Sequence, residues 1–129
     1  MSRPAETGDG GNVQYILLIY GDEREWQSLS QEEMTRVYEA HGAYSKAMQD
    51  AGVLRGGAEL KPVSTATSVR FTNGRPKTVD GPFAETKEQL GGYYLIEVDH
   101  LEQALDWAEK MPGMTSGTVE VRPLGAGAM

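Results

Sequence analysis

The chain has 129 residues, a formal net charge of −7 and no cysteine. This length fits one domain with its own core, and the missing cysteines exclude disulfides, thiolate metal sites and a cysteine nucleophile. The acidic balance, without a cluster of Lys or Arg, argues against binding to nucleic acid or to anionic membranes. No apolar stretch approaches the roughly 20 residues that span a bilayer, and no signal core follows the start, so we expect a cytoplasmic protein.

Three segments are expected along the chain. Residues 1–12 are polar and contain Gly8, Gly10 and Gly11, which predicts a flexible N-terminal tail. Residues 13–124 are predicted to form the domain, and residues 125–129 a short C-terminal tail. The domain opens with a β-rich apolar run over residues 13–20, which predicts a strand that is apolar on both faces.

A polar connection over residues 21–29 leads to the first predicted helix. Ser30 and Glu33 form a capping box, in which each side chain satisfies a backbone donor of the first turn. Gly52 stands where a left-handed C-cap is expected. One apolar stripe runs along this helix at helical spacing: Met34, Val37, Tyr38, His41, Tyr44 and Met48.

Short strands and turn signals fill the middle of the chain. Strands are expected over residues 53–60 and 66–71, and Asn73-Gly74 predicts a hairpin turn that returns through residues 77–79. A loop beginning at Asp80 follows. We expect Phe83 to anchor this loop in the core and Pro82 to stiffen it, which would hold the Asp80 carboxylate in place.

The last part of the chain repeats the pattern of the first. Residues 90–98 predict a second strand that is apolar on both faces, and Asp99 with Glu102 predicts another capping box. The helix that follows is expected to end at Pro112 and Gly113, before a last strand over residues 117–121.

This order predicts an α+β, ferredoxin-like split βαβ fold with an inserted hairpin and one antiparallel sheet. Two helices can cover only one face of that sheet. The uncovered apolar face predicts a homodimer or a higher even oligomer.

Three stretches resemble the DGPF-domain branch of the YCII-related family. The longest is residues 80–94 (DGPFAETKEQLGGYY), the second is the spacing of His41, Tyr44, Met48, Gly52, Leu54 and Gly57, and the third is residues 117–124 (GTVEVRPL). The resemblance implies a dimeric α+β barrel. It also implies a possible His–Asp pair, proposed in some relatives for lyase-like or dehalogenase-like chemistry, and a genetic association with extracytoplasmic-function sigma factors.

His41 and Asp80 are the candidate catalytic residues. His41 is either a buried structural histidine or a general acid or base, and Asp80 is either a turn residue or the carboxylate that orients His41. Four further residues are candidates for binding a small-molecule ligand, with core, interface or surface positions as the alternative: Tyr15, Arg70, Lys87 and Tyr94.

Two functions remain open from the sequence. The first is a cofactor-free enzyme that moves a proton on a small organic molecule. The second is a non-catalytic ligand-binding or accessory protein linked to sigma-factor regulation. No cofactor is expected, because phosphate-loop, dinucleotide and nucleophile-elbow motifs are missing, and two histidines without cysteine support a metal site only weakly.

Overall fold

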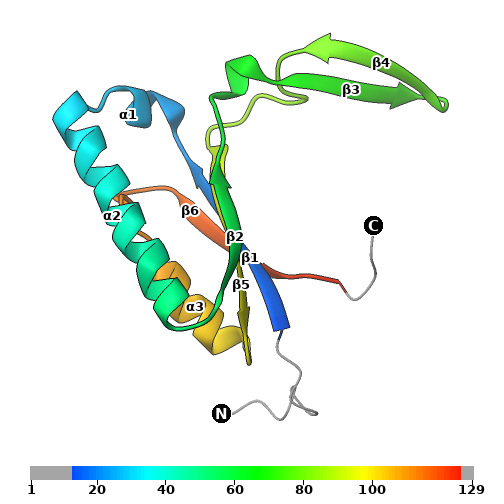
Figure 1. The fold of residues 1–129 in the computed structure, drawn as a ribbon. Helices are drawn as coiled ribbons and strands as arrows, with labels where there is room; N and C mark the ends of the chain where they lie inside the picture. The colour runs from blue at the N-terminus through cyan, green and yellow to red at the C-terminus, as the bar shows by residue number, and fades with distance from the viewer. Residues whose placement is uncertain (1–12, 126–129) are drawn as a thin grey trace.

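The computed structural model describes residues 13–125, and Figure 1 shows how the elements are arranged. The predicted tail over residues 1–12 and the last four residues of the predicted C-terminal tail lie outside this part of the chain. In chain order the elements are β1 (Val13–Gly21), α1 (Glu23–Gln27), α2 (Gln31–Asp50), β2 (Leu54–Glu59), the single 3-10 turn η1 (Val63–Thr65), β3 (Thr67–Thr72), β4 (Arg75–Asp80), β5 (Gln89–Val98), α3 (Leu101–Glu109) and β6 (Thr118–Pro123).

The main sheet has four strands in the order β2-β5-β1-β6, and every neighbouring pair is antiparallel. The two strands predicted to be apolar on both faces, β1 and β5, are its central pair. Helices α2 and α3 lie against one face of the sheet, and within residues 13–125 no helix covers the other face (Figure 1). The predicted α+β class with antiparallel sheets is confirmed, and the strand order agrees with a ferredoxin-like arrangement.

The core lies between the helices and the covered face of the sheet. Alternate residues of a strand point to the same face, so Tyr15 and Leu17 of β1 share the covered face with Ile96 of β5. Met48 of α2 and Ala104 of α3 pack against them, and both side chains have no exposed surface. Burying such apolar surface is the main stabilising contribution to the fold.

The ends of α2 are those predicted from the sequence. The Ser30 hydroxyl accepts a hydrogen bond from the Glu33 amide at 3.0 Å, and the Glu33 carboxylate accepts one from the Ser30 amide at 2.8 Å. Gly52 follows the helix with a φ of +76°, in the left-handed conformation that terminates a helix.

The start of α3 differs from the prediction. The N-cap is His100 rather than Asp99, and the capping side chain is Gln103 rather than Glu102. The Gln103 side-chain oxygen accepts from the amides of Asp99 at 2.7 Å and His100 at 3.3 Å. An amide oxygen accepts these hydrogen bonds as well as a carboxylate does, so Asp99 with Glu102 and His100 with Gln103 both have the spacing of a capping box. The sequence pattern alone predicted the wrong pair.

The inserted hairpin is confirmed and forms a separate two-stranded sheet of β3 and β4. Asn73 and Gly74 both have positive φ, 53° and 80°, as a tight hairpin turn requires. In Figure 1 the hairpin projects from the end of β2, away from the helices. The prediction that Phe83 anchors the following loop in the core is wrong, because this side chain is 79% exposed.

The short helix α1 was not predicted, because five residues carry too little periodicity to distinguish a helix from a polar loop. Over residues 13–125, no helix is both long and apolar enough to cross a membrane.

Candidate functional site

A cavity of about 550 Å³ lies between α2 and the strands β2 and β5, with α1 at one end. This volume is in the usual range of small-molecule sites in proteins. Most of its walls are apolar or aromatic. Its polar side chains include Tyr38, His41, Glu59 and Tyr94, and Trp26 of α1 forms part of the wall.

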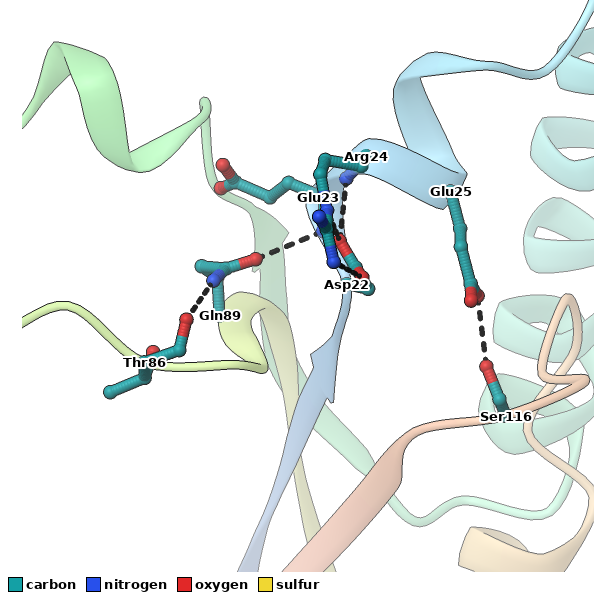
Figure 2. A network of polar contacts seen from close by, with 7 residues as sticks. All are labelled: Asp22, Glu23, Arg24, Glu25, Thr86, Gln89 and Ser116. Atoms are coloured by element: carbon teal, nitrogen blue, oxygen red, sulfur yellow. Dashed lines mark hydrogen bonds and ion pairs between the residues drawn. The ribbon is translucent and has the colours of Figure 1, made fainter.

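The indole ring of Trp26 packs directly against two glycines, Gly21 and Gly91. A Cβ atom added to Gly21 would lie 2.4 Å from the indole ring, and one added to Gly91 would lie 2.5 Å from it. Contacts this short do not occur between real atoms, so both positions need glycine for the ring to take this place. Helix α1 is also held on another side, where the Ser116 hydroxyl donates to the Glu25 carboxylate at 2.9 Å (Figure 2).

A polar network fixes α1 to the start of β5 (Figure 2). Asp22 caps the helix by accepting from the Arg24 amide at 2.9 Å, and it pairs with the Arg24 guanidinium at 2.7 Å. The Gln89 side chain accepts from the Glu23 amide at 2.9 Å and donates to the Thr86 carbonyl at 2.6 Å. These contacts hold the backbone of α1, and therefore position Trp26 over the cavity.

His41 points from α2 toward Tyr94 of β5. The distance between His41 Nδ1 and the Tyr94 hydroxyl is 2.8 Å, and the two rings stack with their centroids 6.0 Å apart and an angle of 12°. Burial lowers the pKa of His41, while the negative charge of Glu59 and a hydrogen bond to the backbone of Pro112 act in the opposite direction. The lowered pKa favours the neutral imidazole of His41.

Tyr44 supports this pair from the core side. Its ring packs edge-on against Tyr94, with 5.2 Å between centroids, and against Trp107 at 5.9 Å. Its hydroxyl donates to the Trp107 carbonyl at 2.6 Å, and burial raises the pKa of Tyr44. Buried rings in such edge-on contacts have little freedom to move, so Tyr94 is held in one orientation.

A carboxylate is also present at the cavity. Glu59, at the end of β2, accepts from the Tyr38 hydroxyl at 2.9 and 3.2 Å, and this bond raises the pKa of Tyr38. Glu59 lies opposite Gly92 and Gly57 lies opposite Tyr94 in the pairing of β2 with β5. The pairing thus places Glu59 on the same face of the sheet as Tyr94.

Of the six residues predicted for the site, the structure brings two together, His41 and Tyr94. Asp80 ends β4 and Arg70 lies in β3, so both belong to the exposed hairpin and neither lines the cavity. Within one chain, the hairpin keeps the Asp80 carboxylate away from the site in which it was expected to orient His41.

The two other predicted residues lie elsewhere. Tyr15 is 7% exposed and belongs to the hydrophobic core, which was the alternative considered for it. Lys87 is exposed and lines a second, more open cavity of about 450 Å³ together with charged residues of the α1 region such as Arg24.

Sequence reasoning missed Glu59 and Trp26. The bulge between Leu54 and Gly56 breaks the alternation of β2, so the strand pattern does not reveal which face Glu59 occupies. For Trp26 a weak signal exists in Gly91, because a glycine inside a strand marks either a bulge or the close approach of another group. In residues 13–125 no group of three or more His, Asp or Glu side chains is placed to hold a metal ion.

The fold and cavity define a small α+β protein with an antiparallel sheet and a histidine-bearing site on its helix-covered face. The chain belongs to the YCII-related family, whose domain model matches residues 13–125. It is also similar to an uncharacterized protein of Rhizobium meliloti (strain 1021), with 41% identity over 112 residues, which is 85% of this chain and 90% of that protein. The family resemblance predicted from the motifs is thus confirmed, and it assigns no activity.

Proposed function

We propose that the chain is a cofactor-free acid–base catalyst that moves a proton on a small organic molecule bound in the His41 cavity. The observation that carries this proposal is the 2.8 Å contact between His41 Nδ1 and the Tyr94 hydroxyl at the wall of a ligand-sized cavity. Histidine is the most frequent general acid or base in enzymes, and tyrosine is also used, so a hydrogen-bonded pair of the two at a cavity wall supports proton transfer.

The contacts of His41 suggest which group meets the substrate. Proline has no N–H, so the Pro112 backbone can raise the pKa of His41 only through its carbonyl, which favours a ring N–H on the side that faces it. Nδ1 faces Tyr94, and Nε2 lies on the side of Gly113. We therefore assign the proton to Nε2, which leaves Nδ1 to accept from the Tyr94 hydroxyl.

In this arrangement Tyr94 is the residue that exchanges a proton with the substrate. Its oxygen accepts a proton from an acidic C–H or O–H group while its own proton passes to His41 Nδ1. The imidazolium that forms is stabilised by the negative charge of Glu59, which in the resting site partly offsets the lowering of the His41 pKa by burial. Asp80 has no part in this step within one chain.

Proton exchange in heavy water tests the proposal without a known substrate. A panel of small cyclic and aromatic ketones with acidic α-protons is incubated with the protein, and loss of the α-proton signal is followed by NMR. We expect the wild type to accelerate exchange for part of the panel, and Tyr94→Phe and His41→Gln to lose this activity. Tyr20→Phe is the matched control, because Tyr20 does not line the cavity.

The outcome also decides between the two function classes. Compounds that bind in the cavity without any accelerated exchange would favour the second candidate, a non-catalytic binding or accessory protein. Equal exchange by the wild type and Tyr94→Phe would contradict the proposed role of Tyr94. A cytoplasmic location stays a prediction from the sequence.

We further propose that a second copy covers the open face of the main sheet, as in the dimeric α+β barrel that the resemblance implies. This face carries Ile16 and Leu18 of β1 and Tyr93 and Leu95 of β5, which alternate with the residues that face the helices. An apolar face on both central strands is typical of an interface. Sedimentation at micromolar concentration is expected to give about twice the chain mass.

A further inference from the structure

We call the hairpin of β3 and β4 (residues 67–80) the arm. Its two faces differ in chemistry. Residues that pair directly across antiparallel strands share a face. Val69 pairs with Thr78 and Phe71 with Pro76, so the outer part of one face is largely apolar, with Thr67 and Asp80 at its base. On the other face Arg70 lies opposite Lys77 and Thr72 opposite Arg75, so its outer part is cationic, with Ser68 and Val79 at its base.

The apolar face is uncovered in the single chain. Phe71 is 70% exposed and Val69 is 55% exposed. In the part of the chain that the structure describes, the arm pairs with no third strand, and a two-stranded hairpin alone is marginally stable in water. The chain contains only two phenylalanines, Phe71 and Phe83, and both are among its most exposed apolar side chains. This placement indicates that the arm is covered in an assembly.

The charge of the arm indicates an acidic partner. Arg70, Arg75 and Lys77 form no ion pair within residues 13–125, and like charges directly opposite in a hairpin are destabilising. The whole chain has a formal net charge of −7, so a second copy offers the opposite charge to the arm. Complementary charge of this kind accelerates association and is weakened by salt.

The direction of the arm fits a second copy packed on the open face of the sheet. In Figure 1 the helices lie on one side of the sheet and the arm projects to the other side. A stable interface buries roughly 800 Å² on each partner, and one phenylalanine ring contributes on the order of 150 Å². We expect the open sheet face and the apolar face of the arm to form this interface together.

From these observations we propose that the arm clasps a second copy of this chain, laying Val69, Phe71 and Pro76 on its surface, while the positive charges of the arm attract the acidic partner at long range. This inference rests on the dimer proposed above and goes beyond it, because packing through the sheet face alone leaves the arm free. In such a dimer the arm of each subunit packs on the surface of the other subunit.

Sedimentation velocity over a range of concentrations tests the clasp with two variants of adjacent residues. Phe71→Ser removes the ring from the apolar face, and Thr72→Ser makes a small change on the opposite face. We expect Phe71→Ser to weaken the dimer by about tenfold or more and Thr72→Ser to leave it unchanged. A wild-type dimer that Phe71→Ser does not weaken would overturn the clasp and leave the sheet-face dimer standing. A wild-type monomer at all concentrations would overturn both.

Cross-linking locates the arm directly and does not depend on the affinity of a variant. The chain has no cysteine, so Thr78→Cys gives a single thiol on the apolar face of the arm for a photoreactive label. Isotope-labelled and unlabelled chains are mixed before irradiation, and the linked peptides are identified by mass spectrometry. We expect links between labelled and unlabelled chains, while links only within one chain would contradict the clasp.

Discussion

Replacing Gly91 by alanine tests how the cavity wall is built. The new Cβ would lie 2.5 Å from Cζ3 and 2.6 Å from Cη2 of Trp26, so the indole ring has to move by about 1 Å to reach a normal carbon–carbon contact. Inserting a methyl group into a filled space costs roughly 1–3 kcal/mol. The cavity lies beside Trp26, so we expect the ring to shift into it and reduce the space for a ligand.

Two measurements check this prediction. Urea unfolding followed by circular dichroism gives the free energy of unfolding, which should fall by roughly 1–3 kcal/mol in Gly91→Ala. Tryptophan emission gives the environment of Trp26 once the second tryptophan is removed by Trp107→Phe, and this emission should change.

Gly42→Ala is the matched control for the same substitution. Gly42 lies in α2, where an added Cβ meets nothing within 4 Å, so alanine should stabilise the protein by roughly 0.5–1 kcal/mol through its better helix propensity. If Gly91→Ala keeps the wild-type stability and the wild-type emission of Trp26, the seating of the indole on Gly91 is refuted.

Three further predictions concern His41, Tyr44 and Leu17. Burial lowers the pKa of His41, so the folded protein binds this proton less readily than the unfolded chain, whose histidine titrates near 6.5. The stability due to a neutral His41 is therefore present above about pH 6.5 and is lost as the pH falls through the lower folded pKa. In urea unfolding, the free energy of unfolding of His41→Gln should therefore change less with pH than that of the wild type between about pH 5 and about pH 7.5. An identical slope of this free energy against pH in both proteins would contradict the prediction. Tyr44→Phe removes the 2.6 Å bond to the Trp107 carbonyl, which also accepts from the Lys110 amide, so we expect a loss of about 1 kcal/mol in thermal unfolding. A loss above about 3 kcal/mol would show that the hydroxyl has a larger role. Leu17→Ala removes a side chain with no exposed surface and should cost about 2–5 kcal/mol by chemical unfolding, and a loss below about 1 kcal/mol would contradict the assigned core.

The main sheet and its helices were predictable because long, periodic segments specify them. The runs that became β1 and β5 are apolar on both faces, and such strands take the central positions of a sheet. The capping box of Ser30 and Glu33 and the turn of Asn73 and Gly74 are local signals, which depend on neighbouring backbone groups and not on the rest of the fold.

The site was predictable only in part, because it depends on contacts between distant segments. His41 and Tyr94 were singled out separately, but their hydrogen bond depends on where α2 crosses β5. Phe83 was expected in the core because it is large and apolar in a polar run. That reasoning treats the single chain as the whole assembly, whereas a ring that is 79% exposed in one chain is suited to contact a partner.

NMR titration of the isotope-labelled protein with a library of small organic fragments tests most directly that the His41 cavity is the functional site. We expect binding fragments to shift the signals of His41, Tyr94 and the Trp26 indole, which line one cavity. We also expect these shifts to be lost in Gly91→Ala, where the displaced indole fills part of that space. Fragments that shift mainly the signals around Lys87 in the second cavity, or no binding fragments at all, would contradict it.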